Sequence, residues 1–201
     1  MKQNVVIVTT GRTGSSWLEN CFKDKLGYNV CRISTSELRG NEFEFLADTD
    51  LEQRIEFLKT YKTPWVCKLI VDDWDYFPLH QLAEIENTQM VWVWRKDTVD
   101  FLLSYAMGVK TRVFNVSEAQ HNYTTPDTIE LEPWQRKEFA RMIEIRDRHW
   151  EYYNHLFDHV LEYSTMFENN PWNFTAGDAL GKLNKYTPEH IEQAKAILET
   201  L

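Results

Sequence analysis

The stretch VVIVTTGRTGSSWLENCF, residues 5–22, constrains the fold more than any other part of the chain. A short β-branched run predicts a buried strand over residues 4–10. Gly11 and Gly14 then interrupt the run, and apolar residues recur at helical spacing up to about Lys25. A strand, a glycine turn and a helix start direct backbone N–H groups and the positive end of the helix dipole at one point. We therefore expect this loop to hold a phosphate.

The rest of the chain alternates between strands and helices. Strands are expected at residues 29–33, 65–71, 90–94 and 159–163, and helices at residues 50–61, 79–86, 98–109, 133–155 and from 188 onward. Residues 112–133 lack a period and are expected to form a long loop. The alternation predicts an α/β fold in one domain over residues 1–201, with a central parallel sheet covered by helices on both faces.

Composition narrows the class of protein. The chain of 201 residues has 43% hydrophobic and 26% charged residues, as expected of one domain with a packed core. Its net charge of −9 excludes general nucleic-acid binding, which needs a basic face, but leaves room for a local anion site. The three cysteines lack metal spacing and favour a reducing, cytoplasmic setting, and no apolar run reaches the length of a membrane span.

The phosphate loop lacks the two best-known nucleotide motifs. It has neither the lysine and spacing of GxxxxGK[ST] nor the pattern GxGxxG. It offers instead the planar guanidinium of Arg12 and the hydroxyls of Ser15 and Ser16. Without the lysine that meets the terminal phosphates, hydrolysis of ATP or GTP is disfavoured.

The residues Arg12-Thr13-Gly14-Ser15-Ser16, followed by Trp17-Leu18, resemble the 5′-phosphosulfate loop of sulfotransferases that use 3′-phosphoadenosine 5′-phosphosulfate (PAPS). The arginine form is closer to the bacterial and carbohydrate-type enzymes. The resemblance implies a P-loop-nucleotide-hydrolase-like sulfotransferase fold, PAPS as sulfuryl donor, 3′,5′-adenosine bisphosphate (PAP) as product, and no metal. Residues 12–17 would then bind the cofactor.

A second cofactor window follows from the same resemblance. The family places an arginine at the end of a later strand and a serine in the next helix, where they bind the 3′-phosphate. Here Arg95 and Ser104 hold these places at an interval of nine residues, whereas Lys96 and Ser104 give the usual eight. Either cation is a candidate, and Arg95 is preferred for its bidentate geometry. Lys68, in a strand, resembles the family's cofactor-facing lysine.

Sulfuryl transfer to a hydroxyl or amine of a small-molecule or carbohydrate acceptor needs a base. Glu37 is the first choice, since its distance from the loop matches the family's glutamate. Arg12, Ser15, Ser16 and the loop amides would meet the charge on the leaving phosphate, and Lys68 is a further catalytic candidate. Other carboxylates remain open as bases: Glu42, Glu44, Asp72, Asp73 and Asp75. Trp74 and Trp134 are candidates for lining the acceptor pocket, which is expected to be either open or completed by a second subunit of a homodimer.

Two other functions remain open at this point. One is a nucleotide or metabolite kinase with a degenerate phosphate loop, which the same strand, loop and helix would suit. The other is a non-catalytic module that binds PAP or PAPS but has no base.

Overall fold

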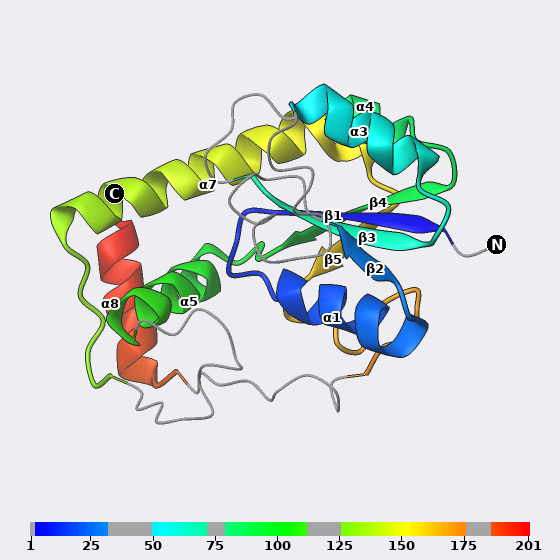
Figure 1. The fold of residues 1–201 in the computed structure, drawn as a ribbon. Helices are drawn as coiled ribbons and strands as arrows, with labels where there is room; N and C mark the ends of the chain where they lie inside the picture. The colour runs from blue at the N-terminus through cyan, green and yellow to red at the C-terminus, as the bar shows by residue number, and fades with distance from the viewer. Residues whose placement is uncertain (1–2, 32–49, 72–78, 112–125, 176–185) are drawn as a thin grey trace.

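The computed structural model of the chain describes residues 3–31, 50–71, 79–111, 126–175 and 186–201. A five-stranded sheet runs through it in the order β2-β3-β1-β4-β5, and each pair of neighbouring strands is parallel (Figure 1). The strands are β1 (Asn4–Thr9), β2 (Asn29–Cys31), β3 (Trp65–Ile70), β4 (Thr88–Trp94) and β5 (His159–Glu162). All five strands lie where the sequence predicts them.

Helices connect the strands as parallel pairing requires. They are α1 (Ser15–Leu26), α3 (Leu51–Thr60), α4 (Leu79–Ala83), α5 (Thr98–Thr111), α7 (Pro133–Tyr153) and α8 (Pro188–Leu198). Most bounds lie within two residues of the prediction. Strand β4 starts at Thr88, two residues earlier than expected. Thr88 is polar, but its backbone pairs with Asn4 of β1. Backbone pairing extends the strand beyond its apolar run.

Alternate residues of the strands supply the two sides of the core. Val6 and Val8 of β1 pack on one face, under α3, α4 and α7. Val5 and Ile7 pack on the other, against α1 and the segment after β5. Both faces are therefore buried, as in an α/β fold, and Figure 1 shows helices above and below the sheet. The predicted fold class is confirmed.

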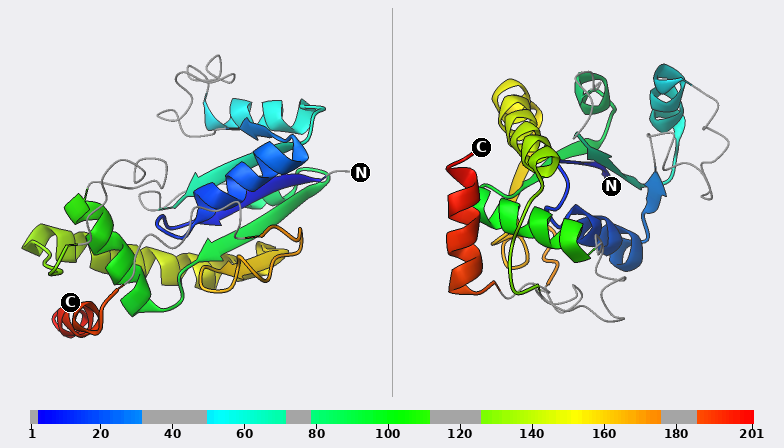
Figure 2. Two further views of the ribbon diagram at one scale, coloured as in Figure 1. Left: turned by 90° about the horizontal axis from the view of Figure 1, so that it is seen from below. Right: turned by 90° about the vertical axis from the view of Figure 1, so that its left-hand side faces the viewer.

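A third apolar cluster lies beyond the carboxyl ends of the strands. It joins α5, α8 and the first half of α7 through residues such as Phe101, Phe139 and Ile197. Figure 2 shows α5 and α8 lying past the ends of the strands. This arrangement puts α5 beside the loop that follows β1. No helix in the part of the chain that the structure describes is long and apolar enough to cross a membrane.

Candidate functional site

The loop between β1 and α1 has an unusual backbone. Three of its residues have left-handed dihedrals, with φ of 78° at Gly11, 52° at Arg12 and 79° at Gly14. A hydrogen bond between the Thr9 and Thr13 hydroxyls closes the turn. Gly14 caps α1 and has no side chain to accept from the first-turn N–H groups. The N–H groups at the positive end of this 12-residue helix therefore receive no hydrogen bond from a capping side chain. Such a helix start is a common binding site for anions.

Two features favour glycine at position 14. Its φ of 79° is strained for other residues, and a Cβ there would lie 2.5 Å from Met166 Cε. The same Cβ would lie 3.0 Å from the Tyr163 ring. The segment after β5 therefore packs directly on the loop and holds it in place.

Lys68 brings a cation to the loop from the neighbouring strand. Lys68 in β3 pairs with Ile7 of β1, and Ile7 lies two residues before the end of β1. Lys68 Nζ donates to Ser16 Oγ at 3.2 Å and lies 3.6 Å from Glu19 Oε2. The side chains of Lys68 and Glu19 are 11% and 5% exposed, so the pair is shielded from water. The lysine thus lies beside the second residue of α1.

The side chain of Arg12 lies along α5. Arg12 Nε donates to the carbonyl oxygen of Ser104 at 3.3 Å. One turn further on, a Cβ at Gly108 would lie 3.1 Å from Arg12 Cζ, so the absence of a side chain at Gly108 gives the guanidinium its space. Arg12 thereby links the loop to α5.

Arg95, which directly follows β4, contacts the backbone of the loop. Its Nε donates to the carbonyl oxygen of Arg12, Nη1 pairs with Asp100, and Cζ lies 3.4 Å from the centre of the Tyr163 ring. Arg146 Nη1 in turn donates to the Arg95 carbonyl at 2.9 Å, which ties α7 to the same point. Arg95 is therefore a buried junction between the loop, α5, α7 and the segment after β5.

The other predicted cofactor residues lie in different surroundings. Ser104 is 2% exposed within α5 and meets the loop through its carbonyl oxygen. Lys96 is exposed, and its backbone N–H donates to Glu162 at 3.2 Å. The structure thus brings Lys68, Arg95 and the loop together, while Lys96 faces solvent.

Several predicted residues fall outside the described part of the chain. They are Glu37, Glu42, Glu44, Asp72, Asp73, Trp74 and Asp75. Trp134, the other tryptophan proposed for an acceptor pocket, is 62% exposed at the start of α7.

Sequence reasoning did not identify Glu19 or Asp100, the carboxylates that pair with Lys68 and Arg95. Glu19 had a detectable signal, because it adjoins Leu18 on the buried stripe of α1, where a carboxylate needs a partner. Thr10, directly before Gly11, is fully buried, and its hydroxyl has no partner among the described residues. Asp100 and Gly108 carry no comparable signal, because their roles depend on how α5 lies against the loop.

Comparison with known proteins gives weak likenesses only. No family model matches the chain, and no curated protein matches it significantly. A shikimate kinase from Acinetobacter baumannii in complex with shikimate is 9% identical, over 98% of this chain and 92% of that one, with a TM-score of 0.46. A gluconokinase from Sinorhizobium meliloti is 10% identical over 75% and 97%, with a TM-score of 0.36. The YorR protein of Bacillus subtilis, in complex with phosphorylated GDP, is 14% identical over 80% and 86%, with a TM-score of 0.43.

At such identities and TM-scores these likenesses assign no activity to the chain. They do contradict the resemblance drawn from the sequence, because the solved structures that were found include kinases and no sulfotransferase. The prediction of a PAPS-dependent sulfotransferase is therefore wrong, and PAPS and PAP are withdrawn as cofactors. The physical reason is that a glycine turn before a helix, as in residues 12–16, would suit many phosphorylated molecules, so this pattern does not specify one of them.

Proposed function

We propose that the protein transfers a phosphoryl group from a nucleoside triphosphate to a small hydroxylated molecule. The loop of residues 10–16 would hold the phosphate chain. This is the kinase with a degenerate loop that the sequence left open. The observation that supports it most is the contact of Lys68 Nζ with Ser16 Oγ at 3.2 Å.

In the motif GxxxxGK[ST], a lysine and then a hydroxyl residue follow the last glycine, and the lysine reaches the terminal phosphates. Here Ser15 and Ser16 follow Gly14, so a serine stands where the lysine would be. Lys68 approaches the hydroxyl residue from the adjacent strand, with its ammonium largely shielded from water. A cation absent from the loop sequence is thus supplied by the sheet.

Phosphoryl transfer mainly requires positioning and neutralisation of charge on the transferred group. Three cations lie at the loop, Arg12, Lys68 and Arg95, and among the described residues Lys68 pairs with Glu19 and Arg95 with Asp100. The first-turn N–H groups of α1 add partial positive charge. This local field suits a phosphate chain that carries its own magnesium ion.

The substrate would be the magnesium complex of ATP or GTP. Magnesium is commonly held by one or two protein oxygens, with phosphate oxygens and water completing its shell. Ser16 Oγ is in place to be that protein oxygen, because it follows Gly14 as the motif requires and keeps a lone pair beside its bond to Lys68. Glu37 remains the proposed base for the acceptor hydroxyl.

The test is calorimetric binding of MgATP and MgGTP, followed by detection of ADP or GDP release with a panel of sugars, hydroxy acids and nucleosides. The proposal expects saturable binding and acceptor-dependent release. The control is the double variant Lys68→Met/Glu19→Gln, which removes both charges of the buried pair together. Saturable binding of neither nucleotide at concentrations up to about 1 mM would overturn the proposal. Binding of MgATP or MgGTP without release of ADP or GDP for any acceptor would indicate a phosphate-binding module without transfer activity.

A further inference from the structure

Two histidine rings from distant parts of the chain lie together on the surface. His80 is the second residue of α4, and His155 is the middle residue of the 3₁₀ turn η2 (Asn154–Leu156), which follows α7. Their ring centres are 5.8 Å apart, and the planes of the rings are tilted by 42°. Both residues are exposed, so a ligand can approach the pair from solvent.

The backbone at both histidines is held in place. Leu79 and Leu82 are both 0% exposed and anchor α4 in the core beneath it. Asn154 Nδ2 donates to the Trp150 carbonyl oxygen at 2.8 Å, and the Phe157 N–H donates to the Asn154 carbonyl oxygen at 3.3 Å. These bonds fix the turn that carries His155. A ligand that joins the two rings would therefore order little additional backbone.

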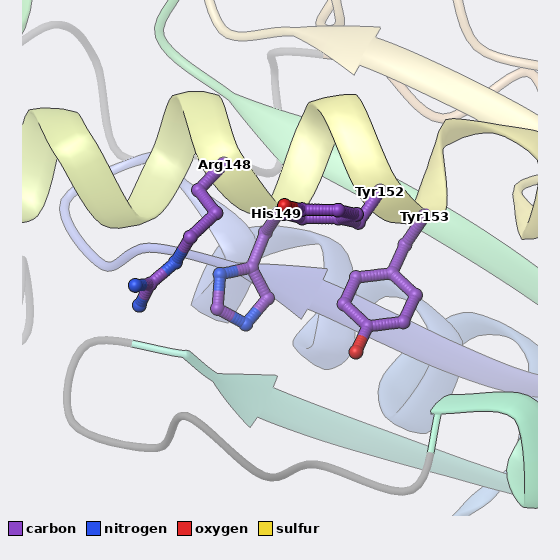
Figure 3. Close-up of a pocket in the computed structure, with 4 residues that line it drawn as sticks. All are labelled: Arg148, His149, Tyr152 and Tyr153. Atoms are coloured by element: carbon purple, nitrogen blue, oxygen red, sulfur yellow. The ribbon is translucent and has the colours of Figure 1, made fainter.

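The His80 ring also has a neighbour on α7. The ring centre of Tyr153 lies 5.7 Å from that of His80, in an edge-on arrangement at 65°. Figure 3 shows the Tyr153 side chain projecting from the end of α7 on the same side of the helix as His149. Tyr153 thus limits the rotation of the His80 ring beside His155.

The separation of the rings fits one shared metal ion. Zinc binds an imidazole nitrogen at about 2.0–2.1 Å, and that nitrogen lies about 1.1 Å from the ring centre, so two rings on one tetrahedral ion have centres about 5.2 Å apart. The observed 5.8 Å is slightly longer. Exposed side chains close such a gap by small rotations about their χ angles.

The donor atoms define the class of metal. Imidazole nitrogen suits Zn²⁺, Cu²⁺ and Ni²⁺, whereas Mg²⁺ and Ca²⁺ prefer oxygen. The two imidazoles would be the protein ligands, with water in the remaining positions. The ranges that the structure describes contain no group of three or more His, Cys, Asp and Glu side chains that could hold a metal ion.

The histidine pair is not part of the phosphate loop. His155 lies four residues before the amino end of β5, whereas the loop follows the carboxyl end of β1. Neighbouring strands of this sheet are all parallel, so these two ends face opposite edges of the sheet. A metal ion at the pair would therefore act apart from the magnesium ion that a nucleotide brings to the loop.

We propose that His80 and His155 bind one divalent transition-metal ion, with zinc as the probe. The ion would join α4 to η2 and so connect two segments that are distant in the chain. Because it would bind the folded protein and not the separated histidines of the unfolded chain, it would stabilise the fold.

The test is calorimetric titration of the full chain, without a polyhistidine tag, with zinc chloride. Scaling down from four-ligand sites gives an expected dissociation constant on the order of 1–100 µM for one ion per chain. Zinc at tenfold excess over that constant should raise the midpoint of thermal unfolding by about 3–6 °C. Magnesium chloride at about 5 mM should not displace the zinc, because its preferred ligands are oxygens.

Three variants assign the ligands. His80→Gln and His155→Gln are each expected to weaken zinc at least about tenfold and to abolish the rise in the unfolding midpoint, because one imidazole remains in either variant. His159→Gln is the matched control, since the His159 ring packs edge-on against Trp172 with ring centres 5.3 Å apart. In NMR spectra of the histidine side chains, zinc should shift the ring nitrogens of His80 and His155 together.

Absence of saturable zinc binding below about 1 mM, or equal losses in His159→Gln and the two pair variants, would overturn the inference. Displacement of zinc by magnesium would also overturn it, because it would indicate an oxygen site. The inference does not rest on the proposed function. The Lys68→Met/Glu19→Gln variant should bind zinc as the wild type does, and His80→Gln should bind MgATP as the wild type does.

Discussion

The buried pair of Lys68 and Glu19 allows the sharpest test of the loop. Replacing Lys68 by Met leaves the Glu19 carboxylate 5% exposed without the ammonium that now lies 3.6 Å away. A buried charge that loses an ion-pair partner typically lowers the free energy of unfolding by as much as about 3–5 kcal/mol. Domains have a total of about 5–15 kcal/mol, so Lys68→Met is expected to be severely destabilised.

The double variant Lys68→Met/Glu19→Gln should behave differently. It removes both charges, and replacing a whole buried pair is often neutral or stabilising. We therefore expect its free energy of unfolding to lie within about 1 kcal/mol of the wild type. Glu19→Gln alone should cost less than Lys68→Met, because Lys68 keeps its hydrogen bond to Ser16.

Urea unfolding of the four proteins, followed by tryptophan fluorescence, measures these differences as a double-mutant cycle. The expected coupling free energy is at least about 2 kcal/mol. Additive effects of the two substitutions would refute the claim that the charges stabilise one another. The double variant, once shown to be folded, should bind MgATP at least about tenfold more weakly than the wild type, since the ammonium beside Ser16 is gone.

Three further predictions concern the surroundings of the loop. Gly14→Ala should lower the free energy of unfolding by about 1–3 kcal/mol in urea titrations, because its φ of 79° is strained for alanine and its Cβ would meet another side chain at 2.5 Å. Gly108→Ala should change stability by less than about 1 kcal/mol yet weaken MgATP severalfold in calorimetry, because it displaces the Arg12 guanidinium. Burial, together with the hydrogen bond to Glu138 and its charge, raises the pKa of Tyr105 above its ordinary value of 10.0. The stability that this gives is complete below about pH 10 and is lost as the pH rises above that, so Tyr105→Phe should remove a fall in the urea midpoint that begins above about pH 10.

The elements of the fold could be predicted because their signals are local. The β-branched run ending at Thr9, the helical spacing after Ser15 and the Thr187-Pro188 start of α8 each specify one element from adjacent residues. The alternation of strands and helices then leaves the parallel sheet as the natural arrangement, because parallel strands need crossover connections. The start of β4 at Thr88 was missed, because it depends on pairing with Asn4 in another strand.

The site was predictable only in part. Glycines and serines in a strand-to-helix turn predict an anion-binding loop, but several families use such a turn, and the resemblance to sulfotransferases was wrong. Arg95 directly follows the end of β4, as the sequence indicates, and its role in binding stays a prediction. Its contacts with Asp100, Tyr163 and the Arg12 carbonyl join residues far apart in the chain, and no local pattern reports them.

The amino-acid sequence by itself determined the strands, the helices and the left-handed glycine turn of this protein, because backbone preference and apolar periodicity act between near neighbours. The tertiary structure alone decided which charges meet at that turn. Lys68 lies 52 residues from Ser16 and reaches it because β3 pairs beside β1. Such contacts depend on the pairing order of strands and the packing of helices, which no short stretch of sequence contains.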